Sequence, residues 1–319
     1  MRVTFWGMRG SIPVALTKAD IRRKLLRTLQ SAIASGLDTP EQMLNFVESN
    51  LDFAVAGTYG GNTPCVQIDI GAQDFYVCDM GSGARELGNR VVALNESGAS
   101  PLVHVLMSHT HWDHIMGFPF FAPIYVPGMR VRIYGCHDTL EHAFRLQQSN
   151  PFFPVDYDSL AAQIEFIQLE LNKPQPIGDL MVTPRLQRHT GDSYGYRFEH
   201  AGKSVVYSTD SEHKLENHAE TKAIAHFFRH ADVLIFDAMY SLLDAVSVRE
   251  DWGHSSNIVG VELAQMARVK HLCMFHHEPA FSDEDIEAVL SQTMRFEQLT
   301  RDWHAVKVSA SYDGLELEV

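Results

Sequence analysis

Cysteine, positive charge and long apolar runs are all scarce in this chain. It has four cysteines in 319 residues, and Cys65, Cys78, Cys136 and Cys273 are dispersed and mostly flanked by apolar residues. We therefore expect buried free thiols in a reducing cytoplasm, with disulfide bonds the less favoured alternative. No apolar run reaches 18 residues and no basic-then-apolar signal opens the chain, which disfavours a membrane span and export.

Lysine and arginine are outnumbered by aspartate and glutamate, 26 to 40, so the formal net charge is −14. This surplus of negative charge disfavours a broad nucleic-acid-binding surface, and long nucleic acids are not expected partners. Low-complexity tracts and repeats of fixed period are also absent. A chain of this length can bury one substantial core, and we expect a single domain over residues 1–319.

Histidine, in contrast, is abundant, with 17 residues, and four potential metal ligands lie between positions 109 and 114. His109 and His111 alternate on a short segment and can reach one ion, while Asp113 and His114 can reach a second. Imidazole and carboxylate favour zinc or a similar divalent ion such as manganese or iron, and two ions about 3.5–4 Å apart commonly hydrolyse phosphoesters. The apolar run 102–107 predicts a buried strand that delivers the motif to a loop at its carboxyl end.

Further histidine and aspartate residues follow three other apolar, β-rich runs. His189 follows the run 180–188, Asp210 follows the run 204–209, and His276 closes the run that begins at Lys270. Taken singly, each fits a surface residue or a hydrogen-bonded core residue. Their serial order after the 109–114 motif favours a two-metal site assembled from several loops.

Together these motifs resemble the metallo-β-lactamase superfamily of metal-dependent hydrolases, and within it the phosphodiesterase branch that includes tRNA 3′-processing endonucleases and cyclic-phosphate phosphodiesterases. The resemblance covers nearly the whole chain. Besides the metal motifs it rests on Val3–Pro13, Tyr59–Thr63, Asp79, Trp252–Ser256 and Phe275–Pro279. The opening and closing segments are more specific for the small-phosphodiester branch than for lactamases.

The resemblance implies two divalent metal ions as cofactors, zinc or manganese, with iron as a further candidate. Each ion would be held by three side chains: His109, His111 and His189 for one, and Asp113, His114 and His276 for the other. Asp210 would bridge the two ions, and Asp79 would orient a ligand histidine by accepting its distal N–H. A turn role for Asp79 is compatible with that function.

The implied reaction is the hydrolysis of a phosphodiester by a water that two cations activate. The carboxylates Asp113 and Asp210, which hold the cations, are therefore counted with the catalytic residues. The leaving alkoxide needs a proton, and the resemblance implies His254 as general acid, because related endonucleases use a histidine of a His-Ser-Thr or similar motif. Ser256 stands here at the threonine position. A structural role for His254, before a helix predicted at 257–267, is the alternative.

Four more residues are candidate substrate contacts. Phe152 and Phe153 lie in a segment that resembles a family loop near the metal cleft, and either ring could stack on a nucleobase. Ordinary loop packing is the alternative for both. Tyr240 fits a phosphate contact or a packed core residue, and His277 directly follows the implied ligand His276.

The expected fold is α/β, a four-layer αβ/βα sandwich with the metals at the edge between its halves. The resemblance implies this arrangement, which periodicity alone does not establish. Strands are predicted at 3–6, 66–70, 75–78, 103–107, 131–134, 164–169, 180–183, 194–198, 205–208, 233–236 and 271–275. Helices are predicted at 83–95, 221–229, 257–267 and 283–301.

Residues 14–57 are an insertion between two motifs that usually lie closer together in the family. A helix is predicted over 18–35, with basic residues between Lys18 and Arg27 and apolar residues at helical spacing between Ile21 and Ile33. We expect this helix to bury its apolar stripe and to expose its basic residues. Pro40 opens a second helix, which predicts a helical hairpin. Two roles are left open for it: a solvated, dimer-stabilising or merely decorative hairpin, and a lid or phosphate-attracting rim.

The leading prediction is a dinuclear metal-dependent phosphodiesterase that acts on small phosphodiesters, with cyclic nucleotides preferred. An RNA 3′-end-processing endonuclease is the enzyme alternative, weakened because nothing here resembles the long Gly/Pro-rich tRNA-clamping arm. A non-catalytic metallo-fold that serves binding or dimerisation is the other alternative, which the complete ligand set disfavours. No membrane partner is expected, and a homodimer is left open.

Overall fold

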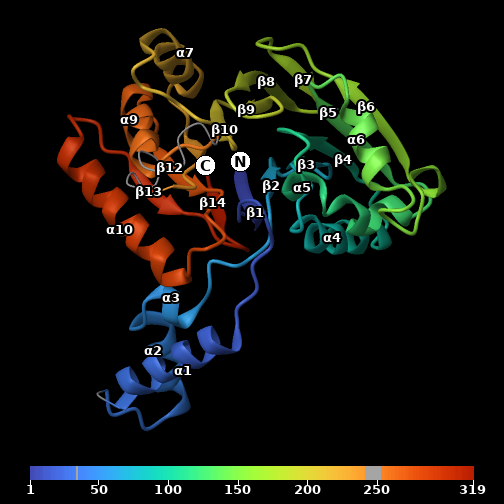
Figure 1. Cartoon of the computed structure of the whole chain (residues 1–319). Helices are drawn as coiled ribbons and strands as arrows, with labels where there is room; N and C mark the ends of the chain where they lie inside the picture. The colour runs from blue at the N-terminus through green and yellow to red at the C-terminus, as the bar shows by residue number, and fades with distance from the viewer. Residues whose placement is uncertain (34, 241–252) are drawn as a thin grey trace.

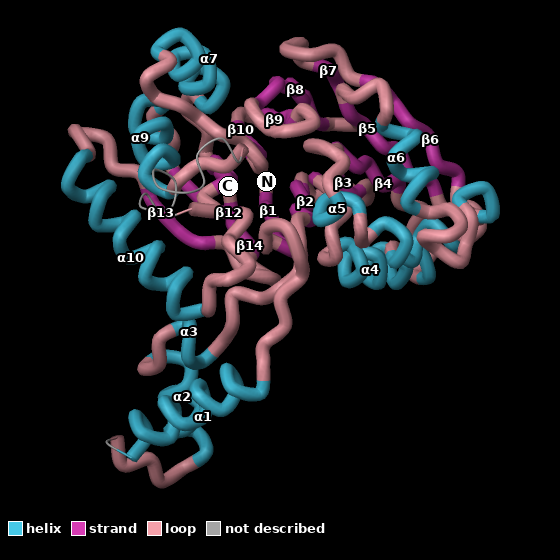
Figure 2. Tube along the Cα trace, in the orientation of Figure 1, coloured by secondary structure: helices cyan, strands magenta, loops and turns pink. Residues whose placement is uncertain are grey.

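The computed structural model describes residues 1–33, 35–240 and 253–319, so Trp252 lies outside the described residues. Two seven-stranded sheets face each other, with helices on the outer side of each (Figure 1). In Figure 2 the strands gather in the middle of the molecule and the helices lie around them. The αβ/βα sandwich predicted from the sequence is confirmed.

Each sheet is described in spatial order. The first sheet consists of β14 (Glu316–Glu318), β1 (Arg2–Gly7), β2 (Cys65–Asp69), β3 (Phe75–Cys78), β4 (Leu102–Leu106), β5 (Arg130–Gly135) and β6 (Gln163–Gln168). The second consists of β13 (Lys307–Ala310), β12 (His271–Phe275), β11 (Val233–Asp237), β10 (Lys203–Ser208), β9 (Ser193–His200), β8 (Leu180–Gln187) and β7 (Gln175–Ile177).

The helices cover the outer faces. Those over the first sheet are α4 (Ala84–Glu96) and α6 (Leu140–Gln147), and those over the second are α7 (His218–Phe228), α9 (Asn257–Ala267) and α10 (Asp283–Thr300). Short helical segments in the first half are α5 (Trp112–Ile115), Phe118–Phe120, Ala122–Tyr125 and Tyr157–Ser159. None of the helices in the described ranges combines the length and apolarity needed to cross a bilayer.

Apolar side chains from both sheets make one core between the layers. Val66 and Cys78 of the first sheet belong to the same buried cluster as Tyr196 and Phe275 of the second. Separate apolar layers lie between each sheet and its helices. Strands buried on both faces explain why the sequence shows continuous apolar runs rather than alternation.

The central strands of both sheets run parallel, which brings their carboxyl ends to a common edge. In the first sheet β3, β4, β5 and β6 are parallel neighbours. In the second, β10, β11, β12 and β13 are parallel neighbours. Residues that follow these strands are far apart in sequence and close in space, as in other α/β folds that bind ligands at strand ends.

Every predicted strand and helix is present within a few residues of its predicted bounds. Not predicted were β7, β13, β14, α3 (Phe53–Ala56), α5, α6 and the short 3-10 helices. β7 and β14 have three residues each, too few for a period-2 pattern to be recognised, and β7 contains Pro176, which argues against a strand. These short strands exist because a neighbouring strand supplies their hydrogen-bond partners.

The insertion 14–57, here called the arm, projects from the body of the molecule (Figure 1). It contains α1 (Lys18–Ile33), α2 (Pro40–Ser49) and the short α3 (Phe53–Ala56). The predicted pair of helices is therefore present. Thr39 caps α2, and its side chain and that of Gln42 each accept a hydrogen bond from the other's backbone N–H.

The orientation predicted for α1 is wrong. No residue of α1 is buried, and its leucine and isoleucine side chains are 49–84% exposed. Three of its five basic residues instead face the body: Lys24 pairs with Asp283 at 2.6 Å, and Arg23 and Arg27 pair with Glu284 at 3.3 and 3.2 Å. Acidic residues at the start of α10 attract the basic side of α1, and this turns the apolar side outward.

Candidate dinuclear metal site

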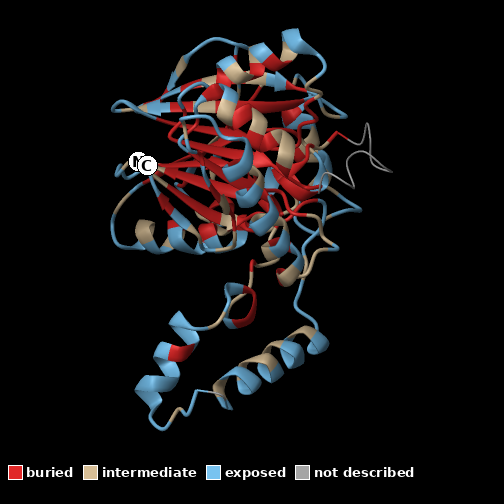
Figure 3. Ribbon diagram, turned by 90° about the vertical axis from the view of Figure 1, so that its left-hand side faces the viewer, coloured by how far each residue is buried: buried red, intermediate tan, exposed pale blue. Residues whose placement is uncertain are grey.

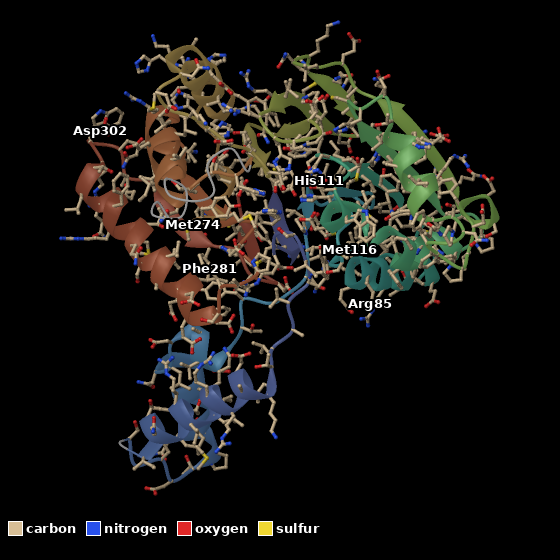
Figure 4. All side chains as sticks on the ribbon, in the orientation of Figure 1. Arg85, His111, Met116, Met274, Phe281 and Asp302 are labelled. Carbon is tan, nitrogen blue, oxygen red and sulfur yellow. The ribbon has the colours of Figure 1, made fainter. Side chains whose placement is uncertain are left out.

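The candidate site lies where strands of the two sheets end. Asp79 follows β3, the motif 109–114 follows β4, and Asp210 and His276 follow β10 and β12. Figure 4 places His111 between the half of the molecule that carries β4 and the half that carries β10. The site therefore forms only when both sheets are assembled.

Three strand-end residues of the site have left-handed backbone conformations. Asp79, Asp210 and His276 have φ values of 61°, 41° and 61°. Such conformations cost a non-glycine residue about 1–3 kcal/mol and cluster at functional sites. The backbone is strained here because a sharp turn aims each side chain into the space between the sheets.

The predicted metal ligands form two groups that share one member. The first group is His109, His111, His189 and Asp210, and the second is Asp113, His114, Asp210 and His276. Within each group the potential ligand atoms lie within 4.8 Å of one another. Asp210 presents one oxygen to each group. Its Oδ2 is 3.6 Å from His109 Nε2 and 3.7 Å from His189 Nε2, and its Oδ1 is 3.1 Å from His114 Nε2 and 3.3 Å from His276 Nε2.

These separations fit metal coordination. Bonds of 2.0–2.2 Å place neighbouring ligands of a tetrahedral ion about 3.4 Å apart, which matches the spacing around both Asp210 oxygens. The Nε2 atoms of His109 and His114 are buried and have no hydrogen-bond partner in the described structure. A buried polar atom without a partner is costly unless something else satisfies it. The donor set therefore fits two divalent ions.

The other ring nitrogens of three histidines are held by hydrogen bonds. His114 Nδ1 lies 2.8 Å from Asp79 Oδ2, His109 Nδ1 lies 3.0 Å from Ser108 Oγ, and His189 Nδ1 lies 2.8 Å from the Gly253 carbonyl oxygen. A proton on Nδ1 leaves the Nε2 lone pair free to bind a cation. The surroundings thus select the tautomer that a metal needs.

The carboxylate of Asp79 is the shared acceptor of this hydrogen-bond network. It is fully buried and accepts hydrogen bonds from the Ser108 N–H and hydroxyl at 2.7 Å each, and from the Tyr207 hydroxyl at 2.7 Å, besides its contact with His114. These bonds fix the loop after β4, the ring of His114 and a strand of the opposite sheet to a single carboxylate. Ser108 and Tyr207 were missed by the sequence analysis, and Tyr207 carries no local signal because its role exists only across the two sheets.

Burial and mutual charge set the protonation of the site. Burial lowers the pKa of His109, His111 and His189, which favours the neutral imidazole that binds metal. Burial opposes charge at His114 as well, but the carboxylates of Asp210, Asp113 and Asp79 raise its pKa. The same attractions hold the carboxyl pKa values of Asp113 and Asp210 below their usual range despite burial. The second group is thus anionic enough to attract a cation.

His254 lies beside one histidine of each group. Its ring centroid is 5.1 Å from those of His189 and His276, and its Nδ1 is 2.8 Å from Asp237 Oδ2. Burial acts to lower the pKa of His254, but the Asp237 carboxylate raises it to about 9. The contact with Asp237 uses Nδ1 and leaves Nε2 as the nitrogen that can transfer a proton.

Asp237 was not predicted as a site residue. It follows β11 directly, is fully buried, and also accepts hydrogen bonds from the backbone N–H groups of Ser211 and Met239 at 3.0 and 3.2 Å. The signal that could have identified it was available, since it is an aspartate at the end of an apolar run, as Asp79 and Asp210 are.

The segment after β1 also reaches the site. The Ser11 N–H donates to Asp113 Oδ2 at 2.8 Å. A Cβ on Gly10 would lie 2.8 Å from the His276 ring, so only glycine lets the chain pass this close. The hydrogen bond thus connects the segment that precedes the arm with the predicted ligand Asp113. Spacing in the sequence could not have indicated this contact.

Two of the four predicted substrate contacts, Phe152 and Phe153, line a cavity. Phe152 is 63% exposed and, with Phe153, lines a cavity of about 430 Å³ that also includes Trp112 and Phe120. Trp112 lies between His111 and Asp113 in the chain and is 76% exposed. Thr110 and Trp112, which line the cavity, therefore alternate along the chain with predicted metal ligands.

Tyr240 and His277 are both buried. Tyr240 is 2% exposed, and its ring lies edge-on to His254 with centroids 5.6 Å apart. His277 is 3% exposed, its Nε2 lies 3.2 Å from the Ser311 carbonyl oxygen, and its ring packs near Tyr59. These contacts account for the position of His277 in the core, and its contact with substrate stays a prediction.

The fold and the paired histidine–aspartate groups together define a metal-dependent hydrolase of the metallo-β-lactamase fold. Residues 76–277 match the family model described as beta-lactamase superfamily domain. The chain belongs to this superfamily.

Known proteins are similar over most of the chain. An uncharacterized protein of Mycobacterium leprae is 29% identical over 208 residues, which is 63% of this chain and 69% of that protein. The crystal structure of the metallo-beta-lactamase fold protein YhfI from Bacillus subtilis aligns with a TM-score of 0.65 and 17% identity, over 100% of this chain and 98% of that one. A diphosphatase from the PhnP family aligns with a TM-score of 0.60 and 20% identity, over 100% and 97%. Ribonuclease Z proteins are also among the relatives and the structural neighbours.

Proposed function

We propose that the protein is a dinuclear phosphodiesterase that hydrolyses small phosphodiesters, with cyclic nucleotides as its preferred substrates. The observation that carries the proposal is the carboxylate of Asp210, which turns one oxygen toward each of two complete ligand groups. A shared carboxylate sets two ions close enough to act on one phosphoryl group. Zinc or manganese suits the mixed imidazole and carboxylate donors, and iron is a further candidate.

In this proposal, the residues of the two groups would hold two divalent ions, which when bound would supply Lewis-acid activation of the attacking water and neutralise phosphoryl charge. The residues of the chain provide the rest. His254 Nε2 donates a proton to the leaving oxygen, and Asp237 holds His254 in place through Nδ1 and keeps it protonated near neutral pH. Asp79 and the Gly253 carbonyl keep the ligand rings of His114 and His189 in a fixed orientation.

The cavity lined by Thr110 and Trp112 of the motif 109–114 supports a nucleotide substrate. Aromatic faces accept any base by stacking, with about 1–3 kcal/mol per stacked base. Trp112, Phe120 and Phe152 offer such faces, at 76%, 59% and 63% exposure. A volume of about 430 Å³ suits one nucleotide rather than a folded RNA. The net charge of −14 also favours a small anion over a long one.

RNA 3′-end processing is the second candidate, supported by the relatives named ribonuclease Z. The two functions predict different rates on a panel of cyclic AMP, cyclic GMP, 2′,3′-cyclic nucleotides, ribosyl cyclic phosphate and a precursor tRNA. We expect the highest kcat/KM on a cyclic nucleotide. Faster cleavage of the precursor tRNA, with metal content measured in the same preparation, would establish the alternative.

Replacement of Trp112 tests the role of the cavity. Trp112→Ala should raise KM for cyclic nucleotides about 5- to 150-fold, the factor that corresponds to one stacked base. Its effect on bis(p-nitrophenyl) phosphate should be smaller. Trp303→Ala is the matched control, because Trp303 is 73% exposed and lies after α10. Equal KM values for wild type and Trp112→Ala would contradict the binding of the nucleobase in this cavity.

We also propose a cytoplasmic location. All four cysteines are free, and Cys65, Cys78 and Cys273 are buried. Unpaired thiols accord with a reducing compartment.

A further inference from the structure

The arm presents a large apolar surface to solvent. Eight side chains of α1 and α2 contribute to it, each 38–84% exposed: Ile21, Leu25, Leu26, Leu29, Ile33, Met43, Leu44 and Val47. Figure 3 shows that the arm stands away from the body and is mostly exposed. Phe46 is the single buried residue of α2, and α1 has none.

This exposure is built into the way that the arm is attached. Lys24 Nζ donates to Asp283 Oδ2 at 2.6 Å, to the Gly57 carbonyl at 2.8 Å and to the Ala54 carbonyl. Asp283 is 1% exposed at its side chain and also accepts the Tyr59 N–H at 2.9 Å. Because this network fixes the polar side of α1 against the body, α1 cannot rotate to bury its leucines without breaking a buried ion pair.

Two physical arguments indicate that another molecule packs against this apolar surface. Helices of fewer than about 12–15 residues are marginal in water without packing, and α2 has ten residues with one buried. The eight exposed side chains are also all large and aliphatic, whereas monomers rarely expose large contiguous apolar patches. A standard interface, to which each partner contributes about 800 Å², has room for a set of this size.

The opposite charges of α1 and α2 indicate that the molecule that packs there is another copy of the chain. α1 carries five basic residues and one acidic residue, whereas α2 carries Glu41 and Glu48 and no basic residue. Lys18 and Arg22 stand on the exposed side of α1, and Glu41 and Glu48 on that of α2. In a two-fold arrangement, α1 of each copy would meet α2 of the other, with apolar stripes in contact and opposite charges beside them.

The rest of the surface supports the same partner. The chain has a net charge of −14, whereas the five basic residues of the arm are matched by Asp20, Asp38, Glu41, Glu48 and Asp52. Contact through a neutral arm lets two strongly acidic bodies stay apart. We propose that the chain forms a two-fold dimer in which the arms pack α1 against the partner's α2. This interface is independent of the reaction at the metal site.

The experiment compares the full chain with the double variant Leu25→Glu/Leu29→Glu by light scattering and analytical ultracentrifugation. The wild type should be a dimer, and the variant should dissociate at least 100-fold more readily with unchanged circular dichroism. Both positions are exposed, at 59% and 60%, so the substitution leaves the monomer's core intact. Met266→Glu/Leu299→Glu, at positions 55% and 67% exposed on other helices, is the matched control and should remain a dimer.

The pairing of α1 with the partner's α2 is tested by zero-length cross-linking. Equal amounts of ¹⁴N- and ¹⁵N-labelled protein are mixed, and bonds from Lys18 to Glu41 or Glu48 should join peptides of different isotope label. Charge reversal at Lys18 and Arg22 should weaken the dimer, and reversal at Glu41 and Glu48 in the second copy should restore it. Cross-links within one isotope label only would contradict the arrangement.

Three outcomes would overturn the proposal. The wild type could be monomeric at concentrations up to about 100 μM, where even weak dimers form. A dimer could persist in Leu25→Glu/Leu29→Glu, which would place the interface elsewhere. Finally, a monomer could bind anionic phosphatidylglycerol vesicles through Leu25 and Leu29 in a flotation assay, which would make the arm a membrane-surface helix.

Discussion

Asp237→Asn should change the pH dependence of the reaction and leave the metal site intact. Asp237 accepts from His254 Nδ1 at 2.8 Å, and its negative charge raises the pKa of His254 to about 9. Asparagine keeps the shape and removes the charge, so the pKa of His254 should fall toward its usual value. The protonated form of His254 is the one that donates, and the rate therefore declines as pH rises through this pKa.

The size of the effect follows from the fraction of protonated His254. At pH 7.5 this fraction falls from about 97% for a pKa near 9 to about 9% for a pKa near 6.5. The structure therefore predicts a roughly tenfold loss of kcat at that pH from protonation alone, and a smaller loss at pH 6. Bound cations lower the pKa of His254 in the wild type and in Asp237→Asn alike. The quantity to measure is therefore the difference in this pKa between the two proteins.

The assay is a pH–rate profile on cyclic AMP and on bis(p-nitrophenyl) phosphate, with metal content determined for each preparation. The alkaline decline should move to lower pH in Asp237→Asn and should be weak on the p-nitrophenyl ester, whose leaving group needs little protonation. Asp232→Asn is the matched control, since Asp232 is 9% exposed and bonds to Ser204 and Lys270 instead. An unshifted decline in Asp237→Asn with full metal content would refute the reasoning.

The other predictions concern metal binding, proton donation and the attachment of the arm. Asp210→Ala should lose both metals and nearly all hydrolysis, because Asp210 is the shared member of the two groups; normal turnover with two ions bound would exclude the bridge. His254→Ala should keep both metals and slow cleavage of cyclic AMP by about 10²–10⁴-fold, with less effect on a p-nitrophenyl ester; equal losses on both substrates would indicate a positioning role. Lys24→Met should lower stability by about 3–5 kcal/mol in denaturant titration, because it leaves the carboxylate of Asp283 buried without its partner. Lys222→Met, on the exposed side of α7, should change stability by less than about 0.5 kcal/mol, and similar losses for the two variants would contradict the buried-pair assignment.

The motif 109–114 and the strand-end residues His189, Asp210 and His276 could be recognised in the sequence because their signal is local. Each follows an apolar run that is long enough to predict a strand, and parallel strands end at a common edge. The architecture followed from the same runs once the resemblance supplied their arrangement. The order of strands, by contrast, cannot be obtained from periodicity, because equally apolar strands fit many positions in a sheet.

Contacts between distant segments depended on the assembled fold. The Tyr207 hydroxyl reaches Asp79 across the two sheets, and the Ser11 N–H reaches Asp113 over a hundred residues of chain. His277 follows the predicted ligand His276 directly in sequence, but only the assembled fold places its ring near Tyr59 and the Ser311 carbonyl oxygen.

The helical spacing of α1 determined that a helix with an apolar stripe would form, and this much is a property of local sequence. Which side faces the body was decided by the tertiary structure. Asp283 and Glu284 at the start of α10, more than 250 residues away, bind the basic side of α1 through Lys24, Arg23 and Arg27. A buried ion pair with complete hydrogen bonding outweighs the burial of a few leucines, because breaking it would leave a charge in the interior without a partner.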